Sequence, residues 1–261
     1  KFDEIYIFDW ERSDFSHVIL LDYFSFIFSN YRLQKFHRKE LAQEINKLMT
    51  MKILGKMSEN IQMDVEKQLI GFQNSTYENL AIVYGNAELI SSEGDFIDDY
   101  FPTDPHRKGI EKQPTGDIYC SILNGKTKLC SISALTKKIV FDQLNGYDEN
   151  LAYEDLDFWI RAARNYNFDY IDEILIQKRM LDNSMYTLLL KKNNPKTRKL
   201  NYSTYLILEK VFLLNKNKAE FKAMLKRIRV EMKVAFHTRD FTLLLRYLLI
   251  DLKVRYSMVT L

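Results

Sequence analysis

Apolar runs separated by polar breaks predict that strands and helices alternate along most of the chain. Short apolar runs predict buried strands at Ile5–Phe8, Ala81–Tyr84, Leu129–Ile132 and Tyr170–Gln177. Runs that are apolar throughout are typical of strands covered on both faces. Between these strands we expect helices at Lys35–Ile53, Gly116–Leu123 and Leu135–Leu144. The pattern therefore predicts an α/β fold, with one mixed sheet flanked by helices.

The pattern changes to a helical one near Asn201 and stays helical to the end. Apolar residues recur there at spacings of three and four, as on one face of a helix. The second such series consists of Phe241, Leu244, Leu245, Leu248, Leu249 and Leu252. We therefore predict a main domain over 1–198 and an all-helical extension over 199–261. The apolar face of the last helix either packs on other helices or lies in a membrane interface.

Composition adds a charge asymmetry to this picture. The chain of 261 residues is 46% hydrophobic and 28% charged, with a net charge of +3. Residues 201–261 hold 12 Lys and Arg against 5 Asp and Glu, so the extension carries +7. It contains no recognised nucleic-acid-binding module, and we expect no nucleic-acid partner. No apolar run approaches the ~20 residues that span a bilayer.

The cysteine content and the beginning of the chain set two further expectations. Cys120 and Cys130 form neither a disulfide framework nor a metal-binding spacing, which favours a reducing, cytoplasmic setting. No signal peptide is recognisable. Lys1 leads straight into the first predicted strand, which suggests a truncated chain.

The stretch Gly146–Arg161 holds the strongest candidate chemistry. A turn is followed by Glu154, Asp155 and Asp157, which we place in or just before the first turn of a helix. Unpaired N–H groups and the helix dipole favour negative charge at that place. The cluster is either a charged cap or, because the position is well ordered, a general base.

The segment from Thr127 to Arg179 resembles the second half of a family 2 glycosyltransferase domain of the GT-A fold. The family phrase G-[YF]-D-E-x-L-x-x-E-D-x-D-[FLW]-W-x-R is almost complete in Gly146–Arg161. This resemblance implies a GT-A-like sheet whose first strand and helix are missing here. It also implies that Asp155 is the base on the acceptor hydroxyl, that Glu154 orients Asp155 or the acceptor, and that Tyr153 and Trp159 contact the acceptor.

The resemblance is weaker on the donor side. It assigns nucleotide or donor contacts to Asp9, Asn86 and Arg179. The family's Asp-x-Asp motif, which binds a divalent cation such as Mn²⁺ or Mg²⁺, is degraded to Glu59-Asn60 here. One Glu and one Asn make a poor site for a hard cation. A family histidine near the end of the domain is replaced by Leu181.

These observations lead to two hypotheses of different classes. The first is an inverting glycosyltransferase that uses a nucleotide sugar, such as a UDP-sugar, and a glycan or lipid-linked glycan acceptor in cell-surface polysaccharide synthesis. The enzyme would be cytoplasmic, with possible peripheral contact to the inner face of the membrane through its basic C-terminal helices. The second is a catalytically impaired GT-A-like protein that binds a glycan or a partner enzyme.

Overall fold

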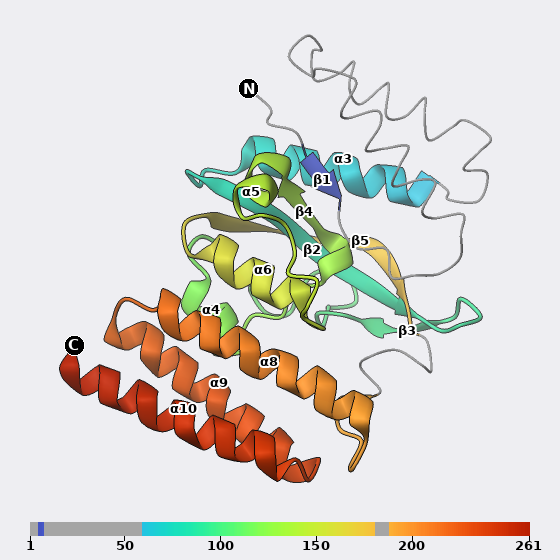
Figure 1. Ribbon diagram of the computed structural model, residues 1–261. Helices are drawn as coiled ribbons and strands as arrows, with labels where there is room; N and C mark the ends of the chain where they lie inside the picture. Colours follow the sequence, from blue (N-terminus) through green and yellow to red (C-terminus); the bar gives the residue numbers. More distant parts are fainter. Residues whose placement is uncertain (1–4, 8–58, 181–187) are drawn as a thin grey trace. The chain divides into compact units, whose positions relative to one another are not determined.

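The structure is a computed structural model that describes residues 5–7, 59–180 and 188–261 (Figure 1). Side chains are described for 67–180 and 188–261. The chain forms two compact units. The first comprises the described residues of Lys1–Lys112, Leu129–Gln143 and Phe168–Arg179, and the second those of Gln113–Lys128, Leu144–Asn167 and Met180–Leu261. The predicted boundary at residue 198 stays a prediction.

A five-stranded sheet is the centre of the first unit. Its strands are β1 (Ile5–Ile7), β2 (Leu80–Ile90), β3 (Phe96–Asp99), β4 (Ala134–Lys137) and β5 (Asn167–Arg179). The order is β1-β4-β2-β3, and β5 also pairs with β2. Thr136 in β4 lies opposite Tyr6 on one side and Ile82 on the other, and both pairings are antiparallel. The predicted strands at Ile5–Phe8 and Ala81–Tyr84 are thereby confirmed in one sheet.

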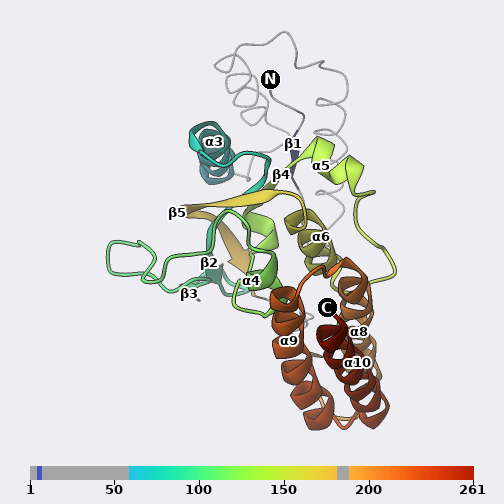
Figure 2. The same cartoon turned by 90° about the vertical axis from the view of Figure 1, so that its left-hand side faces the viewer.

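Helices cover both faces of this sheet. Helix α3 (Glu59–Asn74) packs against β2, and α5 (Lys138–Gln143) lies beside β1 and β4, on the other side in Figure 2. The approach of α3 is close at Gly71, where a Cβ atom would lie 2.8 Å from Ile171 Cδ1 and 3.0 Å from Val83 Cγ1. The fold of this unit is therefore α/β, with helices flanking the sheet.

The second unit is helical. It contains α4 (Tyr119–Leu123), α6 (Glu154–Ala163), α8 (Pro195–Leu214), α9 (Lys218–His237) and α10 (Phe241–Thr260). The three long helices each start with a side-chain cap, which satisfies N–H groups that have no partner within the helix. The capping residues are Asn194, Asn217 and Asp240. Side chains such as Ile228, Tyr247 and Val254 are fully buried between α8, α9 and α10.

The predicted bounds of the strand at Leu129–Ile132 and of the helix at Leu135–Leu144 are wrong. Residues Ser131–Ser133 form a 3₁₀ turn, the strand is β4 at Ala134–Lys137, and the helix starts only at Lys138. The Ser133 hydroxyl donates to Gly85 O at 2.7 Å and Cys130 O at 3.1 Å. Such side-chain bonds to the backbone compete with a strand ladder, so the apolar run turns before the strand begins.

Two other boundaries also differ from the prediction. The segment from Ser91 to Thr115, for which the apolar pattern predicts no strand, contains β3, which pairs antiparallel with the end of β2. Phe96 and Ile97 of β3 are exposed, so no alternating pattern marked the strand. The first long helix starts at Pro195 rather than at Asn201. The predicted helix at Lys35–Ile53 lies outside the described residues.

A glycine in the middle of β2 provides a test of this packing. A Cβ atom on Gly85 would lie 2.6 Å from Leu175 Cγ and 3.2 Å from the Glu173 carbonyl oxygen. We expect Gly85→Ala to lower the free energy of unfolding by about 1–3 kcal/mol, the usual cost of overpacking. Urea denaturation of Gly85→Ala in the parent and in a Leu175→Ala background measures it. The cost should shrink in the second background, and an equal cost in both would contradict this account.

Candidate functional site

The acidic cluster lies at the start of α6, as predicted. Glu154, Asp155 and Asp157 all fall in its first turn, and Tyr153 is the N-cap without making a side-chain capping bond. The Asp155 carboxylate accepts a hydrogen bond from Leu156 N at 2.6 Å. Glu154 and Asp155 are half-buried, whereas Asp157 is 2% exposed. The three acids therefore have different surroundings.

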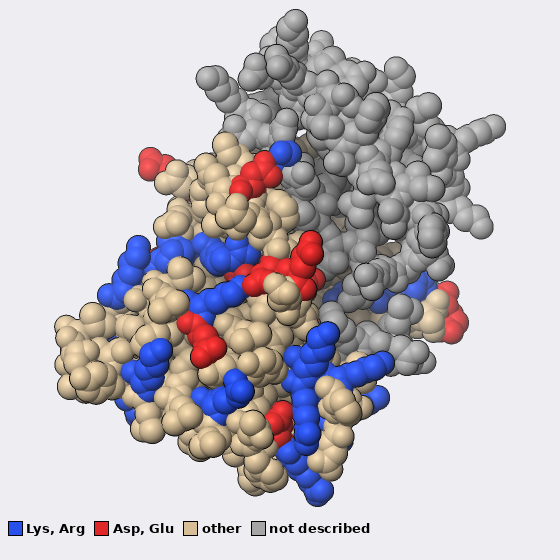
Figure 3. Space-filling model, viewed as in Figure 1, with Lys and Arg blue, Asp and Glu red and all other residues tan. Residues whose placement is uncertain are grey.

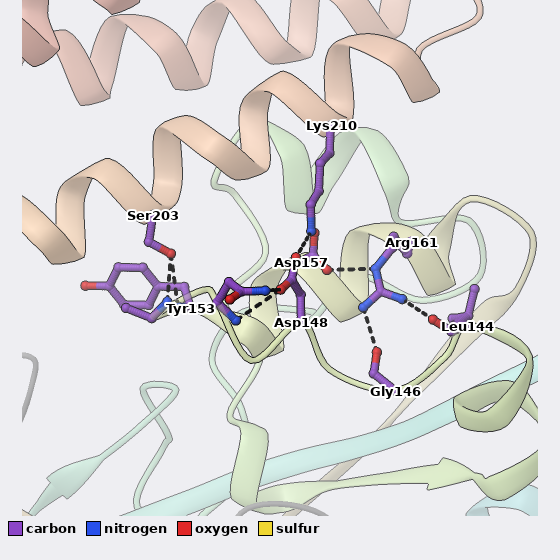
Figure 4. Close-up of polar contacts among 10 residues, drawn as sticks. Leu144, Gly146, Asp148, Tyr153, Asp157, Arg161, Ser203 and Lys210 are labelled. Carbon is purple, nitrogen blue, oxygen red and sulfur yellow. Dashed lines mark hydrogen bonds and ion pairs between the residues drawn. The ribbon is translucent and has the colours of Figure 1, made fainter.

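Asp157 is held between two cations. One carboxylate oxygen accepts from Arg161 Nε at 2.7 Å, and the other from Lys210 Nζ of α8 at 3.0 Å (Figure 4). A buried carboxylate is tolerated only when it is paired and hydrogen-bonded. Asp157 therefore joins α6 to α8, and both of its oxygens are in use.

Arg161 extends this network to the turn before the helix. Its two terminal nitrogens donate to Leu144 O at 2.6 Å and Gly146 O at 2.8 Å (Figure 4). The turn contains Asn145 and Gly146, both with positive φ, at 57° and 66°. Asn and Gly tolerate the left-handed region best. Arg161 thus binds the carbonyl groups that this sharp turn leaves without a strand or helix partner.

Asp148 and Ser203 anchor the loop between the turn and α6. Lys210 Nζ lies 2.6 Å from Asp148, whose carboxylate also accepts from the Asn150 backbone at 3.0 Å. The hydroxyl of Ser203 in α8 accepts from Ala152 N at 2.8 Å and Tyr153 N at 3.4 Å (Figure 4). Two residues of α8, Ser203 and Lys210, therefore hold the loop that leads into α6. These contacts position Glu154 and Asp155.

The bond from Lys210, followed by the bond from Asn150, lowers the pKa of Asp148 to about 2. Because the folded value is below the ordinary value of 3.8, the contribution of this ion pair is present above pH 3.8 and is lost as the pH falls toward 2. Since Lys210 is partly exposed, we expect screening to limit the loss to about 1 kcal/mol. Urea denaturation between pH 5 and about 2 measures this loss, and Asp148→Asn should flatten that part of the profile. An unchanged slope in the variant would contradict the assignment.

The tyrosine and tryptophan assigned to the acceptor lie in the same unit. The Tyr153 hydroxyl is buried and has no hydrogen-bond partner within the part of the chain that is described, and burial raises its pKa. Trp159 is buried among the apolar residues that seat α6. Their acceptor contacts stay predictions, and the unsatisfied hydroxyl makes Tyr153 the better candidate of the two.

The residues assigned to the donor belong to the first unit or lie outside the description. The Asn86 side chain is buried and bonds Phe101 N and O, each at 2.8 Å, and Ala87 N at 2.9 Å. Arg179, at the end of β5, donates to Ser91 O at 2.9 Å and Ser92 O at 2.7 Å and is exposed. Both make structural contacts in their own unit, and their donor contacts stay predictions. Asp9, Leu181 and the rest of their segments lie outside the described residues.

The described residues do not fit a divalent cation. Glu59 is the first residue of α3, and its side chain is not described. Across the part of the chain that is described, no three His, Cys, Asp or Glu side chains converge on one point. Hard cations bind several oxygen ligands, and the metal contact that the resemblance assigns to Glu59 stays a prediction.

Several contacts of this site were not identified from the sequence. The spacing of four between Asp157 and Arg161 is a recognisable signal for a pair on one helix face. Lys210 and Ser203 carry no such signal, because they are about fifty residues away in the sequence and reach α6 only through tertiary packing.

Comparison with models of protein families gives no match, and a search of curated proteins finds no similar one.

Proposed function

We propose that this chain is an inverting glycosyltransferase in which Asp155 is the general base. The observation that carries the proposal is the arrangement at the start of α6. There Asp155 is half-buried, at a helix terminus that Asp157, Arg161, Asp148 and Lys210 fix in place. The resemblance of Gly146–Arg161 to the family 2 phrase supports the same assignment.

The surroundings of each acid support a division of roles within this phrase. A base must present an oxygen lone pair to the acceptor hydroxyl within hydrogen-bonding reach. Asp157 is buried with both oxygens bound to cations, and Asp148 is bound to Lys210 and Asn150. Glu154 and Asp155 are the acids at the start of α6 that keep partial exposure. We therefore propose that Asp157 and Asp148 position the start of α6 and that Asp155, with Glu154 beside it, acts on the acceptor.

The reaction is a single displacement at the anomeric carbon of a nucleotide sugar. The Asp155 carboxylate takes the proton of an acceptor hydroxyl as the hydroxyl oxygen bonds to the anomeric carbon. The bond from that carbon to the nucleoside diphosphate oxygen breaks at the same time, and the diphosphate leaves with the bonding electrons. Attack from the side opposite the leaving group inverts the configuration.

The first experiment asks whether the chain binds and uses a nucleotide. Calorimetric titration with UDP, with and without Mn²⁺, measures binding. Release of nucleoside diphosphate from a panel of nucleotide sugars measures transfer to acceptor or water. We expect saturable binding and slow diphosphate release with at least one donor. Absence of binding and of release for every donor would refute the enzyme and leave the alternative, a glycan-binding or partner-binding module.

A further inference from the structure

One face of α10 is apolar, continuous and exposed. Its residues are each at least 43% exposed, and they are Phe241, Leu245, Leu248, Leu249, Leu252, Tyr256 and Val259. At 3.6 residues per turn these seven lie on an arc about 100° wide that contains no charged position. The opposite arc, with Leu243, Tyr247, Ile250 and Val254, is buried. We call the exposed arc the α10 stripe.

The α10 stripe is not the face with which this helix packs on its neighbours. The predicted series Phe241 to Leu252 was expected either to pack on other helices or to lie in a membrane interface. The helix packs instead through the arc around Tyr247. The centre of the Tyr247 ring lies 5.6 Å from that of the Tyr205 ring in α8. Most of the predicted series remains exposed, and Phe236 of α9 extends it, with its ring 6.4 Å from that of Phe241. Single exposed apolar residues are ordinary, but a contiguous patch marks an interaction site.

Cations border the α10 stripe on both edges. Arg255 lies on one edge, and Arg246 and Lys253 lie on the other, by the same helical geometry. Arg246 donates to the Tyr202 hydroxyl at 3.0 Å, and Lys253 Nζ lies 4.2 Å from the centre of the Phe212 ring. These contacts neutralise no charge. The one acid of α10, Asp251, is bound to Arg255 at 2.5 Å, so the net positive charge of α10 lies on the edge with Arg246 and Lys253.

The neighbouring helix α9 adds to the positive charge. Its exposed face holds Lys222, Lys226, Arg229 and Lys233, whereas its two acids, Glu220 and Glu231, are buried in ion pairs with Arg164 and Arg227. In Figure 3 the part of the surface that α8–α10 form is mainly tan and blue. An apolar stripe with basic borders is the pattern of a helix that lies in a lipid interface.

We propose that the α10 stripe docks on a membrane surface that contains anionic lipid. The apolar side chains enter the boundary between headgroups and acyl chains, and the flanking cations contact the lipid phosphates. Charge complementarity selects this occupant over a second copy of the chain. Pairing two stripes would bring the cations of one copy beside those of the other, whereas anionic headgroups supply the opposite charge. The inference is independent of the proposed function.

Docking of this kind places the helix along the membrane rather than across it. Across the residues that the structure describes, no helix combines the length and the apolar character that crossing a membrane requires. In α10 the charged Arg246, Asp251, Lys253 and Arg255 interrupt the apolar residues.

Vesicle flotation of the full chain tests the proposal. The probes are vesicles of phosphatidylcholine with 0, 20 and 40% phosphatidylglycerol. We expect the bound fraction to rise with the anionic content and to fall as salt rises, because salt screens the contacts of the cations. Binding that changes with neither the anionic lipid content nor the salt concentration, or no binding to any vesicle, would overturn the proposal.

A matched pair of variants assigns the binding to the α10 stripe. Leu249→Gln with Leu252→Gln removes two exposed leucines and is expected to weaken the vesicle partition by about tenfold or more. Ile110→Gln, an equally exposed apolar residue of the first unit, should leave it unchanged. Equal vesicle binding by both variants would refute the assignment of the binding surface to the α10 stripe. Concentration-dependent dimerisation that is lost only in the leucine variant, without vesicle binding, would instead assign the stripe to a second copy.

Discussion

Asp157→Ala is expected to lower the free energy of unfolding by about 3–5 kcal/mol, the cost of breaking a buried ion pair by removing one partner. The carboxylate is 2% exposed and lies 2.7 Å from Arg161 Nε and 3.0 Å from Lys210 Nζ. Alanine leaves Arg161 without its counterion and leaves Lys210 paired with Asp148 alone. It also releases Arg161 from one of the bonds that orient it toward Leu144 and Gly146. Urea denaturation followed by circular dichroism measures the loss.

An exposed ion pair of the same spacing provides the matched control. Lys138 and Asp142 are also four residues apart and lie 2.7 Å from each other, but Asp142 is exposed. Exposed pairs contribute about 1 kcal/mol or less, so Asp142→Ala should have a small effect. If Asp157→Ala cost no more than Asp142→Ala, the network would not be what fixes the start of α6.

The sequence predicted α6 well because local rules determine it. Acids in the first turn, apolar residues facing the core and the turn at Gly146 are all signals within sixteen residues, and each is present in the structure. The burial of Asp157 between two cations, next to the half-buried Glu154 and Asp155, was not predictable. It depends on Lys210, which comes from another helix more than fifty residues away. The resemblance singled out Asp155, but the burial of Asp157 follows from tertiary contacts that the sequence pattern does not show.

The strands show the same contrast. Ala81–Tyr84 was predictable because its four residues are fully buried in the middle of the sheet. The apolar run Leu129–Ile132 was misread because Ser133 bonds the backbone of Gly85, in a strand about fifty residues earlier. β3 was missed because its pairing with β2 needs only backbone groups, while Phe96 and Ile97 stay exposed. Apolar runs indicate which residues are buried. They indicate where a strand begins only if no side-chain hydrogen bond to a distant part of the fold turns the backbone first.

Asp155→Asn is expected to reduce turnover by about a hundredfold or more, since general-base catalysis contributes effects of that size. The substitution is nearly isosteric, and its carbonyl oxygen can still accept from Leu156 N, so the start of α6 is preserved. The amide cannot take the proton of the acceptor hydroxyl. Rates of diphosphate release with the best donor of the panel, at saturating donor, provide the measurement.

Three controls make this result specific to the base. UDP binding by calorimetry should match the parent, because Asp155 acts on the acceptor and not on the nucleotide. The free energy of unfolding should stay within about 0.5 kcal/mol of the parent, as for substitutions that keep caps and core intact. Glu154→Gln, at the neighbouring half-buried acid, should retain more turnover than Asp155→Asn. Parent-like turnover in Asp155→Asn would remove it from the mechanism, and a larger loss in Glu154→Gln would transfer the role of base to Glu154.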